Sequence, residues 1–375
     1  MKSTRFVVLV SIMLGASAPG LVRATPPPPL PPCVSASAAV TVTALGAILA
    51  GNGNDHVRRC AAQDLAARGA TAVPVLVGML GSRDSDTLAL ALGALTDMGP
   101  QAQAALPALM DRIRTPPPAL QEIYLWESYR ALYDAVSAIG AGARPAIPLL
   151  IARSRDPGHR YDAVGALGKL GKYDAGRVVP YLVSILESPE AWDTPGDTRA
   201  VVDALANIGK GARAGLPATL ALLERAKAAG SSMDGWSALH ALVAIAEHGE
   251  SIPVLTSLLH QPVLASDAAM GLSSIGPPAA SAVPALIDQL KRSREDPNVA
   301  DNIMSALAAI APQSPAVQQQ LLAEVTQHGS EWAALVLSHI APLPPHFAPA
   351  LAAALAKKPG DFFLSKALEN TRRTK

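Results

Sequence analysis

The sequence has 375 residues, of which half are apolar and 16% are charged, and its formal net charge is +1. A near-neutral chain has no electrostatic basis for binding nucleic acid, because such binding depends on neutralising phosphates with basic side chains. The two cysteines alone do not form a zinc-site pattern. We therefore expect no nucleic-acid partner, no metal and no cofactor.

The N-terminus has the pattern of a secretion signal. Lys2 and Arg5 precede an apolar stretch over residues 6–18, and a small residue, Ala24, offers a cleavage site. This pattern predicts a signal peptide over 1–24 and a periplasmic or secreted protein; the alternative is an uncleaved anchor. Cleavage would remove three basic residues and change the formal net charge from +1 to −2. No later segment has the roughly 20 apolar residues that a membrane span needs.

A proline-rich stretch, TPPPPLPP, follows the predicted cleavage site. It favours extended polyproline II, so residues 25–33 are interpreted as a stiff spacer. Cys33 and Cys60 are the two cysteines, and an oxidising compartment would permit a disulfide between them. The alternative is two independent thiols. The segment 34–56 is expected to form an N-terminal capping helix.

A repeated pattern occupies residues 57–358 and determines the predicted fold. Five copies contain an apolar helix end, a glycine and a proline, as in ALTDMGPQAQAALPAL from Ala94 and ALANIGKGARAGLPATL from Ala204. In four copies the proline follows the glycine by eight residues, and in the fifth, Gly171 and Pro180, by nine. From Pro74 to Pro284 the prolines recur at intervals of 33, 41, 32, 37, 36 and 31 residues. Such periods are typical of repeats built from helix pairs.

Each unit can be interpreted physically. A glycine such as Gly209 supplies a left-handed residue that ends the first helix. The proline lies in the first turn of the second helix, where its missing N–H costs little. Neither helix can bury its apolar stripe alone, so the pairs must stack. The sequence therefore predicts an all-α solenoid of about nine helical hairpins, with residues 359–375 as C-terminal cap and tail.

The strings ALxxIGxxAxxAVPxLxxxL and, from Val57, VRRCAAQDL resemble HEAT repeats, especially the short bacterial type also found in phycobilisome lyases. The resemblance implies a right-handed α–α superhelix that places the second helices on its concave side. It also implies a binding scaffold and, in a minority of members, lyase or hydroxylase chemistry.

Catalytic motifs are scarce in this sequence. It contains no nucleophile elbow, phosphate-binding glycine loop or HExxH helix. The sequence His248-Gly249-Glu250 faintly resembles the His-Glu pairs of HEAT-type hydroxylases, which need several such pairs. Acidic residues between the units, such as Asp84 and Asp296, are interpreted as helix caps rather than as a calcium ladder. A non-enzymatic protein is therefore expected.

Two groups of residues are candidates for partner binding. Trp126, Trp192 and Trp236 lie in three lengthened connections, where insertions in repeat proteins often form a binding face. Second-helix positions expected on the concave side are Arg112, Arg153, Tyr181, Asp288 and Gln289. Their mixed, mild polarity favours a protein or peptide partner. The alternatives are a lyase-like enzyme or enzyme accessory protein, and a purely structural spacer.

Overall fold

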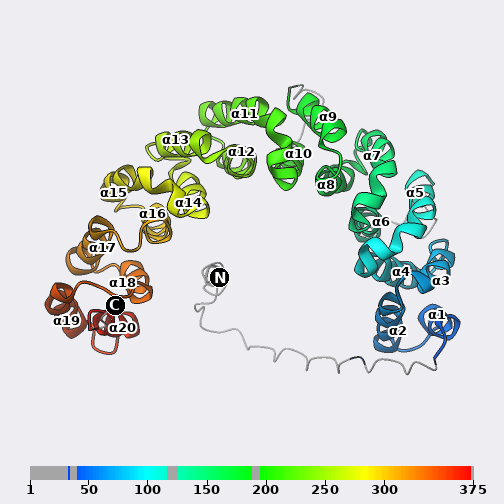
Figure 1. The fold of residues 1–375 in the computed structure, drawn as a ribbon, viewed down its shortest axis with the longest axis horizontal. Helices are drawn as coiled ribbons and strands as arrows, with labels where there is room; N and C mark the ends of the chain where they lie inside the picture. The colour runs from blue at the N-terminus through cyan, green and yellow to red at the C-terminus, as the bar shows by residue number, and fades with distance from the viewer. Residues whose placement is uncertain (1–32, 34–39, 116–125, 188–194, 373–375) are drawn as a thin grey trace, which may run out of the picture.

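The computed structural model describes residue 33 and residues 40–115, 126–187 and 195–372. Within these ranges the chain is helical, without strands, and forms nine consecutive helix pairs from α2 to α19. The pairs stack side by side into one curved solenoid (Figure 1). The all-α prediction is confirmed. The predicted signal peptide, and the spacer up to Cys33, lie outside the described residues.

The helices form two layers along the arc (Figure 1). One layer lies on the inside of the curve and consists of α2 (Asp55–Ala67), α4 (Ser85–Met98), α6 (Trp126–Ala138), α8 (Arg160–Leu170), α10 (Pro195–Ile208), α12 (Ser232–Ile245), α14 (Ala265–Ile275), α16 (Pro297–Ile310), α18 (Glu331–His339) and α20 (Phe362–Asn370). We call these the inner helices. Each packs directly against the next inner helix.

The other layer lies on the outside of the curve (Figure 1). These outer helices are α1 (Val42–Ala50), α3 (Val73–Met79), α5 (Leu106–Arg114), α7 (Ile147–Arg153), α9 (Ala175–Glu187), α11 (Leu216–Ala229), α13 (His248–Leu258), α15 (Val283–Arg292), α17 (Pro315–His328) and α19 (Ala348–Lys357). The expected capping helix therefore begins at Val42 and is an outer helix.

The turn from an inner to an outer helix uses the predicted glycine. Gly99, Gly140, Gly209 and Gly276 have φ between 55° and 72°, a region that favours glycine because it has no Cβ. A short 3-10 segment follows each of them and leads into an outer helix with proline in its first turn. The left-handed glycine and the proline start are confirmed in these four copies.

The copy with the nine-residue gap is built differently. Gly171 has φ −59°, so the left-handed prediction is wrong there. Helix α9 begins at Ala175, without a preceding 3-10 segment, and Pro180 lies inside it. Residues that form the 3-10 segment in the other copies belong to α9 here, so Pro180 lies about one turn further into the outer helix than the other prolines.

The return turns, from outer to inner helices, use side-chain caps. The Asp84 carboxylate accepts a hydrogen bond from the Thr87 N–H at 3.0 Å, and Asp296 accepts from the Val299 N–H at 3.3 Å. Such caps satisfy donors that have no partner inside the helix. The capping interpretation is confirmed for these two residues, whereas Asp267 and Asp301 lie within helices.

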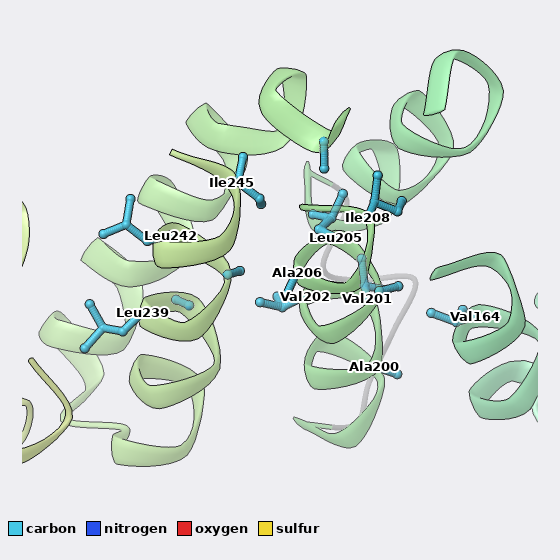
Figure 2. Close-up of a cluster of buried hydrophobic side chains, with 14 of the residues drawn as sticks. Val164, Ala200, Val201, Val202, Leu205, Ala206, Ile208, Leu239, Leu242 and Ile245 are labelled. Atoms are coloured by element: carbon cyan, nitrogen blue, oxygen red, sulfur yellow. The ribbon is translucent and has the colours of Figure 1, made fainter. Parts of the chain in front are cut away.

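Small residues bring the inner helices close together. The apolar pair near the end of each inner helix contains alanine in six copies, including Ala166 and Ala204, which are 3% and 1% exposed. At Gly168 an added Cβ would lie only 2.7 Å from the Ala204 Cα, so α8 and α10 approach closely there. Figure 2 shows Val201 of α10 directed toward Val164 of α8, with Val202 on the opposite side of the helix, toward α12.

The first unit is held by polar and covalent links. The buried Arg58 side chain donates to the Leu49 carbonyl at 2.9 Å and to the Asp84 carboxylate at 2.7 Å, which joins α1, α2 and the start of α4. A disulfide links Cys33 to Cys60 of α2. Of the two alternatives for the cysteines, the structure contains the bridge.

At the other end, α20 packs on α18 and α19. Leu364 is buried there, whereas Phe362 is 67% exposed. No helix among the described residues is both long and apolar enough to cross a membrane.

Candidate functional site

The hollow of the arc is lined by the inner helices. These helices pack against each other along the arc and against the outer helices behind them, so their remaining exposed side faces the hollow (Figure 1). From α6 to α14 this side carries large side chains, and we call it the central concave patch. Its members are Arg130, Asp134, Tyr161, Asp162, Lys169, Arg199, Asp203, Asn207, Met233, Trp236, His240 and Met270.

Three side chains of the central concave patch are large, apolar and exposed. Tyr161 on α8 is 60% exposed, Met233 on α12 is 55% exposed and Met270 on α14 is 45% exposed. Methionine adapts its shape to different partners, and tyrosine combines an apolar ring with a hydrogen-bonding tip. All three lie on inner helices, so the fold leaves apolar groups uncovered on this layer, with the polar residues of α10 between Tyr161 and the two methionines.

Charged residues surround a hollow of about 250 Å³ between α6, α8 and α10. Lys169 donates to the Asp134 carboxylate at 2.5 Å, and Arg130 lies 3.6 Å from the same carboxylate. Burial raises the pKa of the neighbouring Asp162, while the positive charges of Arg130 and Lys169 oppose that rise. The charges therefore neutralise one another locally, and this part of the patch has no single sign.

The indole of Trp236 lies at the centre of a second group. It stacks on the His240 ring with 5.7 Å between centroids, and the Arg199 guanidinium lies 5.4 Å from its centroid. Arg199 is also 3.6 Å from Asp203 of its own helix. Stacking and cation–π contacts hold the indole in one orientation while part of it stays accessible. This geometry suits a rigid aromatic anchor for a bound polypeptide.

The assignment of the second-helix candidates to the concave side is wrong. Arg112, Arg153, Tyr181, Asp288 and Gln289 lie on α5, α7, α9 and α15, which are outer helices (Figure 1). The physical reason is spacing. Helices on the inside of a curve must lie closer together than those outside, and the small residues that permit this occur on the first helix of each sequence unit.

Three of these outer side chains bond to a neighbouring repeat, and Asp288 pairs with Arg292 of its own helix at 2.8 Å. Arg153 donates to the Arg114 carbonyl at 2.5 Å, and the Tyr181 hydroxyl lies 2.6 Å from the Ser154 hydroxyl oxygen. Gln289 bonds to His260 at 2.9 Å. Each contact joins neighbouring repeats on the convex side. These residues therefore have a role in the outer layer.

The tryptophan candidates have different outcomes. Trp192 lies outside the described residues, and so does the side chain of Trp126, although its backbone begins α6. Trp236 is not in a lengthened loop, because Gly230 ends α11 and Ser231 caps α12 directly. It belongs to the central concave patch instead. The sequence thus identified one patch residue but placed it on the wrong surface.

Sequence reasoning missed most of the patch. Arg130, Tyr161, Arg199 and Trp236 each lie ten residues before the turn position, and Asp134, Asp203 and His240 lie six before it. In an inner helix these two positions share a face that lies outside the apolar core. An alignment of the repeats at the positions ten and six residues before the turn would have shown large side chains recurring there in successive repeats.

A polar group joins α6 to the start of α8 next to the central concave patch. The Tyr133 hydroxyl is 3.0 Å from Nδ1 of His159, and the Asp156 carboxylate is 3.8 Å from Nε2 of the same ring. Burial lowers the pKa of His159 and raises that of Tyr133. Because Tyr133 is 2% exposed, this group anchors the start of α8 to α6.

Comparisons with known proteins agree with this geometry. A family model for HEAT repeats matches residues 42–124. No curated protein matches the chain. Among solved structures, one describing Kap95p binding to RanGDP matches with a TM-score of 0.56 at 14% identity, covering 88% of this chain and 50% of that chain. Kap121p bound to Nup53p matches with a TM-score of 0.52 at 15% identity, covering 88% and 40%.

Kap121p bound to the extreme C-terminus of the phosphatase Cdc14p matches similarly, with a TM-score of 0.52 at 15% identity and coverage of 88% and 41%. The present chain thus spans half or less of these karyopherin chains. At such low identities the likeness shows the fold alone, an all-α superhelical solenoid. The match to the HEAT-repeat model thus covers the N-terminal part of the chain, and the described helices beyond it continue the same two-layered stack with the same glycine turns.

Proposed function

We propose that this protein is an exported, non-catalytic scaffold that binds a protein or peptide through the central concave patch. The carrying observation is that exposed Tyr161, Met233 and Met270 and the partly exposed Trp236 all lie on inner helices between α8 and α14. Exposed apolar groups gathered on one surface mark interaction sites, and tryptophan and tyrosine are enriched among residues that dominate binding energy. The similar solenoid of Kap121p is described as bound to protein partners, which supports this kind of ligand.

The charges of the central concave patch favour a polypeptide over a polyanion. Arg130 and Lys169 share Asp134, and Arg199 is paired with Asp203, so these basic side chains do not form an uninterrupted stripe. A polypeptide supplies both apolar anchors and mixed polar groups, as the patch requires. Such an interface relies on apolar contact for affinity and on the charges for selection of the partner.

The proposed site is tested by site-specific photocrosslinking in the cells that make the protein. A photoreactive amino acid at position 161 or 233 should give one recurring protein adduct, because both side chains are exposed on inner helices. The same probe at 112 or 289 tests the convex side and should not give it. The Trp236→Ala variant should lose the adduct, whereas Tyr173→Ala, which removes an exposed tyrosine outside the hollow, should keep it. Equal adducts from both sides of the arc would refute the concave site.

Export is tested separately. N-terminal sequencing of the mature protein from the cell envelope or medium should begin at Thr25, because Ala24 ends the predicted signal peptide. An intact Met1 on a protein found in the cytoplasm would refute this part of the proposal. The crosslinking result does not depend on it.

A further inference from the structure

The disulfide near the N-terminus has a histidine beside it. His56 and Cys60 lie four residues apart on α2, so their side chains share one face of the helix. The Nε2 atom of His56 is 3.6 Å from the Sγ atom of Cys60. Cys33 is brought to the same place by its bond to Cys60. Among the described residues, this is the single group of three metal-binding side chains whose ligand atoms lie within 4.8 Å of one another.

The distances match those of a metal site. In a tetrahedral zinc site, sulfur lies at about 2.3 Å and nitrogen at about 2.1 Å from the ion, which places the two ligand atoms roughly 3.6 Å apart. This is the observed separation of His56 Nε2 and Cys60 Sγ. After reduction, the two sulfurs would need to separate to about 3.8 Å to bind the same ion. All three side chains are half-buried, so solvent and a cation can reach them.

We propose that Cys33, His56 and Cys60 form a site for a zinc-like, thiophilic cation when their disulfide is reduced. Two thiolates and one imidazole are a ligand set that zinc accepts, with a water molecule in the fourth position. The disulfide and the metal exclude each other, because a sulfur in an S–S bond is not a thiolate. Both the disulfide and the bound metal ion would link Cys33 to α2. The N-terminal end of the solenoid therefore stays closed in both redox states when the cation is present.

The exchange between the two states balances with a dithiol as reductant. One dithiol thiolate attacks the Cys33–Cys60 bond and forms a mixed disulfide, and its second thiolate then displaces the remaining cysteine. The dithiol gives up two electrons and becomes a disulfide, and its two protons end on Cys33 and Cys60. Binding of the divalent cation releases these two protons again, because the bound form of each cysteine is the thiolate.

The test uses the full mature chain and Co²⁺ as a spectroscopic substitute for zinc. The protein is reduced with a dithiol, freed of reductant without oxygen, and titrated. We expect one Co²⁺ per chain, with a sulfur-to-cobalt charge-transfer band and the visible bands of tetrahedral Co²⁺. The oxidised protein should show neither. Zinc should displace the cobalt stoichiometrically.

Variants decide whether the histidine is a ligand. His56→Ala should weaken binding by at least about 10-fold, since loss of even an outer-shell partner typically costs 10- to 100-fold. His248→Ala is the matched control, because it removes an exposed histidine on another repeat. Equal binding by His56→Ala and the unmodified chain would overturn the three-ligand site, and so would equal binding by the oxidised protein. Circular dichroism of each variant checks that the helical stack is unchanged.

Discussion

Glycine at the inner-to-outer turn provides a quantitative test of how the repeat is built. Gly276 has φ 72° and ψ −141°, a region that L-residues with a Cβ rarely occupy. An added Cβ would meet no atom within 4 Å. The Gly276→Ala change therefore isolates the backbone cost from any steric clash. Residues held in such sparsely populated regions cost about 1–3 kcal/mol, and we expect a destabilisation of that size.

A matched control exists within an inner helix. Gly93 lies inside α4 with helical geometry, and its Cβ would also meet nothing within 4 Å. Gly93→Ala should stabilise the protein by roughly 0.5–1 kcal/mol, because alanine loses less backbone freedom on folding. The same chemical change should thus shift the urea unfolding midpoint in opposite directions at the two positions.

The assay must allow for the architecture. Long repeat arrays can lose two-state behaviour, so a single free energy of unfolding is not sufficient. Hydrogen exchange followed by mass spectrometry reports each repeat separately, and in Gly276→Ala the loss of protection should be largest in α14 and α15. If Gly276→Ala unfolds at the same urea concentration as the unmodified protein, or if Gly93→Ala is equally destabilised, the role assigned to the left-handed turn is wrong.

Three further predictions follow from particular side chains. Hydrogen bonding from Thr87, with a smaller contribution from Arg58, lowers the pKa of Asp84 from 3.8 to about 2. The ionised Asp84 therefore contributes stability that is present above about pH 4 and is lost as the pH falls toward 2. Acid-unfolding curves of the Asp84→Asn variant should lack this dependence on pH. A variant curve identical to that of the unmodified protein would contradict the assignment. Leu286→Ala, at a fully buried position, should cost about 2–5 kcal/mol, with reduced hydrogen-exchange protection confined to the adjoining repeats. Tyr161→Ala should change thermal stability little, within about 0.5 kcal/mol, because the side chain is 60% exposed; a larger loss would show that the ring is structural.

The sequence allowed the repeat to be predicted because glycine and proline have local requirements. A left-handed turn needs glycine, and a helix start tolerates proline, so their eight-residue spacing at Gly209 and Pro217 predicts the hairpin without knowledge of its neighbours. The same reasoning failed at Gly171, where one additional residue allowed another helical geometry. A spacing rule holds only while the number of residues in the turn is constant.

Which layer lies inside the curve could not be predicted in the same way. Curvature depends on how closely helices of successive repeats approach, and that depends on side-chain size at contacts between repeats. Gly168 against Ala204 is such a contact, at residues separated by a whole repeat. Assigning the second helices to the concave side relied on a resemblance instead of on these sizes. The error moved five candidate residues to the opposite surface.

The fold does not require the large side chains of the central concave patch. Positions ten and six residues before the turn are Ala89 and Gly93 in α4, yet they are Arg199 and Asp203 in α10. Both helices occupy equivalent places in the stack and bury apolar side chains at five equivalent positions near their ends, so this packing does not require a large or charged residue at either site. The large side chains of the patch therefore expose apolar area without a packing gain. A bound partner would bury this exposed apolar area. We therefore assign partner binding to the inside of the arc.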